Sequence, residues 1–146
     1  MVKLIVGPKG TGKTKRMISL ANDRVEKSDG SVVFINKNQR LMYDLKYTIR
    51  VVSMEDYEEI TNSDEYIGFI FGIISSNHDI EAIFIDSILK HADVSKEDIP
   101  EFLDRLAQIA EKYEIEIIVS LSAQPEELGG AIRHFTVLNE KDLAAG

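Results

Sequence analysis

The sequence contains no cysteine. A disulfide framework, a thiolate metal site and a cysteine nucleophile are therefore excluded. Histidine is scarce as well: His78, His91 and His134 stand apart, and none has a second ligand at metal-site spacing. Structural or surface roles are favoured for all three.

The chain also lacks a hydrophobic run that could cross a bilayer. Its longest strongly apolar stretch, Tyr66–Ile74, is well short of the roughly 20 residues that a membrane-spanning helix needs. The N-terminal letters VKLIV lead straight into glycines, which predicts a strand and not a signal peptide. We therefore expect a cytoplasmic protein without a membrane partner.

Apolar residues make up 44% of the 146 residues and charged residues 29%, as in a globular protein. We expect a single domain over residues 1–146. The net charge of −8 argues against broad binding to nucleic acid. Residues 1–50, however, carry 11 basic and 4 acidic side chains, while residues 51–104 carry 2 basic and 14 acidic ones. A basic N-terminal third suits a phosphate site, although segments can also interleave in space.

Apolar runs alternate with helical periodicity along the chain, as in repeated βα units. The predicted strands are Val2–Val6, Val32–Ile35, Ile49–Val52, Ala82–Ile85, Ile115–Leu121 and Phe135–Leu138. Helices are predicted over Thr14–Lys27, within residues 36–47, from about Asp64 to Ser76 after a Ser63 cap, and from Ile99 to Tyr113, with a capping box at Ser53. Buried strands joined by helices predict an α/β fold of three α/β/α layers with a mainly parallel sheet of about five or six strands.

Gly68 and Gly72 lie four residues apart in one predicted helix and share a face. Glycines at this spacing permit close backbone approach. Packing of this face against the sheet is the favoured interpretation, and a contact between subunits is the alternative.

The stretch GPKGTGKT matches the pattern G-x-x-x-x-G-K-[ST] and stands between a predicted strand and a predicted helix. Its glycines permit a tight turn that aims backbone N–H groups at one anion, and the helix adds its N-terminal dipole. The lysine would reach the β- and γ-phosphates, and the threonine hydroxyl would hold Mg²⁺. We predict that a nucleotide is bound by Gly7, Pro8, Lys9, Gly10, Thr11, Gly12, Lys13 and Thr14. A purely structural strand-to-helix turn is the alternative.

A second candidate segment is EAIFIDS, where an apolar strand ends at Asp86. A carboxylate in this position, about 70 residues after such a glycine loop, has the Walker B arrangement and would hold Mg²⁺ through water. Asp86 is therefore predicted as a metal residue together with Thr14.

With these two segments, the chain resembles the P-loop NTPases, and among them the RecA-like branch that includes the thymidine kinases. VGPKGTGKT is similar to their IGPMFSGKT-like loops, and IRVVSMEDYEEI is similar to their intervening strand and helix. Two predicted strands separate the Walker segments here, in agreement with the strand order of that branch. The resemblance implies a P-loop NTPase fold that binds ATP and Mg²⁺.

The chain departs from this family in several places. It has neither the cysteine-containing zinc segment nor the substrate lasso of the thymidine kinases, and Ser87 follows Asp86 where they have Glu. The stretch FINKNQR offers Asn36 and Asn38 where related ATPases often place a Glu. An Asn can orient a water molecule but cannot take its proton.

The resemblance also implies a γ-phosphate sensor at the end of the fifth strand, where Ser120, Ser122 and Gln124 are candidates. Polar residues that merely end a strand are an equal alternative. Arg133 is a candidate arginine finger for a neighbouring subunit, although an ordinary surface role is favoured. With Lys13, the candidates for catalysis are thus Gln124, Asn38 and Arg133.

Basic residues also gather between the second and third predicted strands, as Lys37, Arg40, Lys46 and Arg50, with Asp44 among them. At the mouth of the sheet they could meet a second phosphate-bearing ligand or a nucleic acid strand, but exposed lysines need no such explanation.

Three functions remain open. The first is slow Mg²⁺-dependent ATP hydrolysis that rests on charge stabilisation by Lys13. The second is a nucleotide-gated switch that recruits a protein partner or another copy of the chain. The third is a kinase for a nucleoside-like substrate. The guanine-reading pattern N-K-x-D is absent, because Gln39 ends NKNQ, and ATP is therefore favoured over GTP.

Overall fold

The computed structural model describes residues 1–8, 10, 12–40, 42–87, 93–122 and 136–138. Within these ranges, parallel strands form one sheet in the order β3-β2-β4-β5-β1-β6. The strands are β1 (Val2–Gly7), β2 (Ser31–Asn36), β3 (Arg50–Ser53), β4 (Ile80–Ile85), β5 (Glu116–Ser122) and β6 (Thr136–Leu138). The prediction of a mainly parallel sheet of about five or six strands is confirmed.

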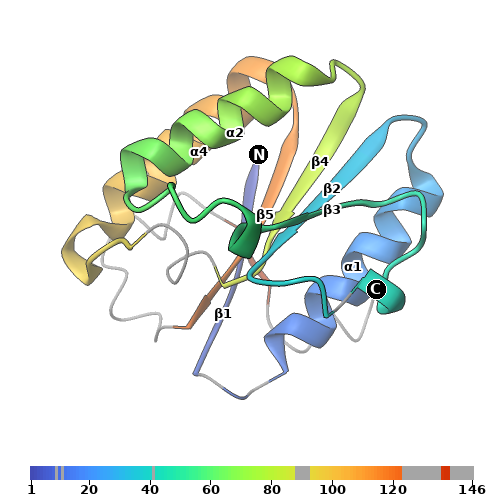
Figure 1. Cartoon of the computed structure of the whole chain (residues 1–146), viewed down its shortest axis with the longest axis horizontal. Coiled ribbons are helices and arrows are strands. Elements are labelled where there is room, and N and C mark those ends of the chain that lie inside the picture. Colours follow the sequence, from blue (N-terminus) through green and yellow to red (C-terminus); the bar gives the residue numbers. More distant parts are fainter. Residues whose placement is uncertain (9, 11, 41, 88–92, 123–135, 139–146) are drawn as a thin grey trace.

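Helices cover both faces of the sheet (Figure 1). One face carries α1 (Lys13–Lys27), and the other carries α2 (Ser63–Ser76) and α4 (Ile99–Tyr113). Short 3-10 helices are η1 (Met42–Asp44), η2 (Met54–Asp56) and η3 (Lys96–Asp98). The architecture is thus the expected three-layer α/β/α fold. Over the described ranges, no helix combines the length and the apolar character needed to cross a membrane.

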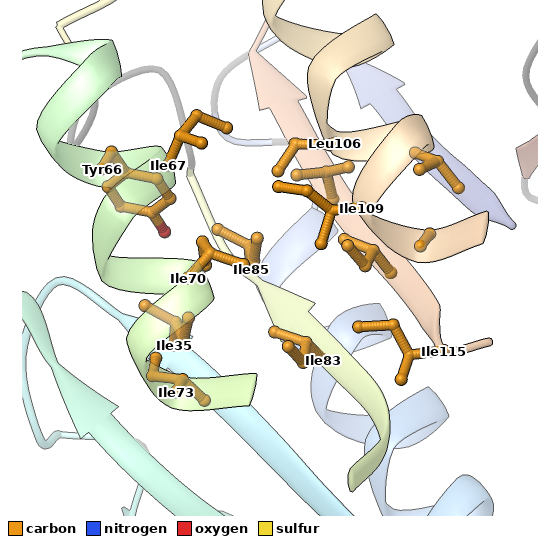
Figure 2. Close-up of a cluster of buried hydrophobic side chains, with 14 of the residues drawn as sticks. Ile35, Tyr66, Ile67, Ile70, Ile73, Ile83, Ile85, Leu106, Ile109 and Ile115 are labelled. Carbon is orange, nitrogen blue, oxygen red and sulfur yellow. The ribbon is translucent and has the colours of Figure 1, made fainter. Parts of the chain in front are cut away.

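The apolar strands fill two cores because neighbouring side chains of a strand point to opposite faces. On one face, Ile85 of β4 meets Ile70 of α2 and Ile109 of α4 (Figure 2). On the other face, Met17 of α1 lies in a core that includes the stacked rings of Phe34 and Phe84, whose centroids are 6.3 Å apart. Burial on both faces explains why these strands are apolar without alternation.

The segment over residues 36–47 is not the continuous short helix that the sequence predicts, because among its described residues, which are all but residue 41, only η1 is helical. Side-chain hydrogen bonds compete with a helix at its start: the Asn38 Oδ1 atom accepts from the Arg40 N–H at 2.9 Å, and the Asn36 Nδ2 atom donates to the Asn38 carbonyl at 3.3 Å. Further along, the buried Leu45 draws the chain onto the α1 core.

Two predicted caps are also wrong. Asn62, and not Ser63, caps α2, since the Asn62 side chain accepts from the Glu65 N–H at 2.9 Å. The Ser53 hydroxyl makes no capping bond to η2 and instead donates to the Lys37 carbonyl at 3.3 Å. Ser53 therefore joins the end of β3 to the chain that follows β2.

The glycines of α2 do not pack on the sheet. Gly68 and Gly72 are exposed, and a Cβ atom at either position would meet nothing within 4 Å. The apolar side chains of α2, such as Ile67 and Ile70, fill the core side of this helix instead. The favoured interpretation of this glycine pair is thus wrong.

Candidate functional site

Strand order brings the two sequence motifs to the same edge of the sheet. β1 and β5 pair in parallel with Gly7 beside Ser122, and β5 pairs with β4 so that Ile85 lies beside Val119. The glycine loop after β1 and Asp86 after β4 therefore both follow carboxyl strand ends, with the end of β5 between them. Ligands of open parallel sheets bind at this kind of edge.

The backbone of the loop depends on glycine at two positions. Gly10 has a φ of 84° and Gly12 a φ of 82°, both in the left-handed region that glycine adopts without strain. Gly12 is also the N-cap of α1 and has no side chain to bond the first N–H groups of the helix, and no acidic residue stands in the first turn. The helix dipole at this end is therefore not offset by a neighbouring carboxylate of its own helix.

The Lys13 side chain folds back over the loop. Its Nζ atom donates to the Gly7 carbonyl at 2.9 Å and to the Pro8 carbonyl at 2.8 Å, and the residue is only 8% exposed. A positive charge is thus held against the first two carbonyl groups of the glycine loop. The groups that accept hydrogen bonds from the Lys13 ammonium group include these two neutral carbonyls. A neutral carbonyl binds an ammonium group less strongly than an anion does.

Asp86 joins the glycine loop to the sheet. The Thr14 hydroxyl donates to the Asp86 Oδ2 atom at 2.9 Å across 72 residues of sequence. The Ser120 hydroxyl donates to Oδ1 at 2.8 Å, and it accepts from the Ser87 N–H at 2.7 Å. Asp86 is 2% exposed and Ser120 fully buried, so both carboxylate oxygens accept hydrogen bonds in a site nearly closed to water.

This donor set is suited to a hard divalent cation. Mg²⁺ prefers oxygen ligands and in nucleotide sites takes only one or two from the protein, with water and phosphate oxygens completing its shell. The Thr14 hydroxyl and the Asp86 carboxylate fit that limited share. Nowhere in the described ranges do three or more His, Cys, Asp or Glu residues gather as a metal cluster.

Ser120 has a role that sequence reasoning missed. The sequence groups it with candidates for phosphate contact, whereas its hydroxyl is committed to Asp86 and Ser87. The signal was a hydroxyl residue inside the apolar strand IIVSLS. A buried hydroxyl needs a partner, and the neighbouring strand end supplies it.

The remaining predicted residues fall into two groups. Ser122 is exposed at the end of β5 beside Gly7, and Asn38 lies after β2, which β4 and β5 separate from β1. The Asn38 Oδ1 atom is already engaged in a local turn.

Several other predicted residues lie outside the described ranges: Lys9, Thr11, Gln124, Arg133, His91 and His134. His78, within the described residues, is exposed.

The four basic residues after β2 do not gather at this edge. Lys37 and Arg40 are exposed beyond the carboxyl end of β2, but Arg50 begins β3 at the opposite edge of the sheet. Lys46 forms an ion pair with Glu26 of α1. The prediction that these residues lie at the mouth of the sheet is thus wrong for Lys46 and Arg50. β2 and β3 are parallel neighbours, so the chain between them must return to the opposite edge of the sheet before β3 begins.

Comparison with protein-family models gives no match for this chain, and a search of curated proteins gives none.

Proposed function

We propose that this chain is a P-loop protein that binds MgATP and hydrolyses it slowly. One observation carries the proposal: the Thr14 hydroxyl, directly after the glycine loop, donates to Asp86 at the end of a strand 72 residues later. In the proposed reading, these residues are the Walker A threonine and the Walker B aspartate.

Binding would use the features already present at the loop. The loop N–H groups and the N-terminus of α1 would receive the phosphates. Lys13 would exchange its carbonyl partners, which include Gly7 and Pro8, for phosphate oxygens, whose negative charge attracts the ammonium group more strongly than a neutral carbonyl dipole does. The Thr14 hydroxyl would keep an oxygen lone pair for Mg²⁺ while it donates its proton in the hydrogen bond to Asp86. The bound metal would supply charge neutralisation at the phosphates.

Slow turnover follows from the groups around Asp86. Both of its oxygens already accept hydrogen bonds from Thr14 and Ser120, so this carboxylate is poorly placed to take a proton from water. Ser87 next to it cannot act as a carboxylate base. Catalysis would then rest on the positive charge of Lys13 and on positioning.

The occupied oxygens of Asp86 also favour a second candidate function. A chain that binds MgATP tightly but has no base can act as a switch, in which nucleotide orders a surface for a partner. A kinase for a nucleoside-like substrate remains the third candidate. In a kinase, the proton to be removed would belong to the hydroxyl group of the acceptor substrate and not to water.

The test is calorimetry with MgATP and MgGTP, followed by steady-state phosphate release. Lys13→Ala should weaken MgATP binding by about 10- to 150-fold, since hydrogen bonds to charged groups contribute about 1.5–3 kcal/mol. The matched control is Lys15→Ala on the exposed side of α1, two residues away, which should change affinity by less than about two-fold.

Equal affinities of wild type and Lys13→Ala would refute the P-loop assignment. Turnover that disappears in Lys13→Ala would establish hydrolysis and direct attention to Gln124, Arg133 and Asn38. Tight binding without phosphate release would select the switch or the kinase.

A further inference from the structure

Two tyrosines stand almost entirely in solvent. Tyr43 is 89% exposed and Tyr47 is 97% exposed. A buried aromatic side chain contributes a large apolar area to a core or an interface. These two rings contribute none to the fold, so the structure gives them no role in stability.

The exposed rings nevertheless extend from an anchored backbone. Leu45, between them in sequence, is buried in the core on the α1 side of the sheet. The side-chain amide of Asn22 on α1 binds the segment twice: its Nδ2 atom donates to the Asp44 carbonyl at 3.0 Å, and its Oδ1 atom accepts from the Lys46 N–H at 2.9 Å. A ligand that docks on these rings would therefore lose little free energy in ordering the segment.

Exposed cations come before and after the tyrosines in the sequence. The chain leaves the carboxyl end of β2, passes beside α1 and enters β3 at the opposite edge of the sheet (Figure 1). Lys37 and Arg40 stand on the first part of this path and Arg50 at its end. All three are exposed, and none forms an ion pair with another residue in the part of the chain that the structure describes.

We propose that this surface binds single-stranded nucleic acid. The Tyr43–Tyr47 surface is the exposed strip along residues 37–50, which extends from Lys37 and Arg40 past Tyr43, Asp44 and Tyr47 to Arg50 at the other edge of the sheet. Unpaired bases stack on aromatic rings without regard to sequence, while cations beside the rings neutralise phosphates. A duplex hides the faces of its bases and cannot use the tyrosines in this way.

A protein partner fits the same surface less well. The core of a protein interface is a packed apolar area. Along this segment, the described residues add only one further exposed large apolar side chain, Met42 at 42% exposure. The net charge of −8 applies to the whole chain and opposes broad binding, and the exposed Asp44 between the tyrosines repels phosphate as well, so contact is confined to the cations of this surface and affinity is modest.

The experiment is fluorescence anisotropy of the full chain with labelled oligo(dT) and oligo(U) of about 12 nucleotides, and with a duplex of equal length. The single strands should bind more tightly than the duplex. Tyr43→Ala and Tyr47→Ala should each weaken binding by at least about five-fold, while Tyr43→Phe and Tyr47→Phe should bind like wild type, because stacking needs the ring and not the hydroxyl.

Salt dependence gives a second readout that a folding defect would not imitate. Three cations on a single strand predict a slope of log K against log salt of about −2, and Arg40→Gln should reduce it to about −1.4. The matched control is Tyr113→Ala on α4, a half-exposed tyrosine on the other helical layer, which should leave affinity unchanged.

Absence of oligonucleotide binding at about 50 mM salt would overturn the proposal. So would alanine variants that bind like wild type, or a preference for the duplex. Saturable binding of poly-glutamate that oligonucleotide does not displace would assign the surface to an acidic protein partner instead. None of these measurements involves Lys13 or MgATP. A negative result would therefore refute the nucleic-acid proposal without refuting the proposed function, and the reverse also holds.

Discussion

Removal of one buried hydroxyl tests the geometry around Asp86. In Ser120→Ala, the Asp86 Oδ1 atom loses its donor at 2.8 Å and the Ser87 N–H loses its acceptor at 2.7 Å. Ser120 is fully buried and Asp86 is 2% exposed, so water cannot replace either bond without rearrangement. Alanine is smaller than serine, and steric strain does not contribute.

The magnitude follows from the charge of the partner. A hydrogen bond to a charged group contributes about 1.5–3 kcal/mol, and a buried group left unsatisfied costs about 1–3 kcal/mol. We expect Ser120→Ala to lower the free energy of unfolding by about 3 kcal/mol. In an Asp86→Asn background the acceptor is neutral, and the same change should cost only about 1 kcal/mol. The double-mutant cycle should then give a coupling of about 2 kcal/mol.

The assay is urea unfolding followed by circular dichroism. Ser120→Ala should shift the midpoint without changing the m-value. The control is Ser75→Ala, because the Ser75 hydroxyl donates to the Gly72 carbonyl on an exposed helix face, and its removal should cost within about 0.5 kcal/mol. If Ser120→Ala cost no more than Ser75→Ala, or if its cost were the same with Asp86→Asn, the reasoning about this carboxylate would be refuted.

The remaining predictions concern backbone conformation and one carboxylate. Gly12→Ala should lower the free energy of unfolding by about 1–2 kcal/mol, because φ at Gly12 is 82°. Gly68→Ala and Gly72→Ala, in open space on α2, should each raise it by about 0.5–1 kcal/mol. If denaturant unfolding gave changes of the same sign at Gly12 and on α2, the assigned backbone conformations would be contradicted. The pKa of Glu65 should lie below its usual value because the Thr61 N–H and then the Thr61 hydroxyl donate to it. This contribution to stability is present above the unfolded pKa and is lost as pH falls through the lowered folded pKa. NMR titration should show the pKa of Glu65 rising part of the way back in Thr61→Val, and an unchanged value would exclude the hydroxyl contact.

The strands and the two motifs could be predicted from sequence because their signals are local. Apolar runs mark β1, β4 and β5, and the glycine pattern before α1 fixes where the strand ends and the helix begins. The carboxyl-terminal position of Asp86 after an apolar run is likewise visible in a few letters. These elements needed no knowledge of which strand lies beside which.

The errors arise where distant contacts decide. Ser120 bonds Asp86 only because β5 lies beside β4, and strand order is not a local property of either segment. At the start of α2, Asn62 and Ser63 are adjacent residues that both cap helices well, and sequence cannot choose between them. The segment after β2 follows the burial of Leu45 against α1 rather than its helical propensity.

The position of β1 in the sheet has a consequence for synthesis on the ribosome. β1 is translated before β2 to β6, yet its partners are β5 and β6, and even the Met1 amino group donates to the Ile115 carbonyl, 114 residues away. At about 5–20 residues per second, translation reaches β5 roughly 6 to 25 s after β1. Once β4 has been translated, β2, β3 and β4 can pair with one another while β1 still lacks both of its strand neighbours. The strand that carries the glycine loop is therefore paired only after β5 has been made, long after the loop itself has been translated.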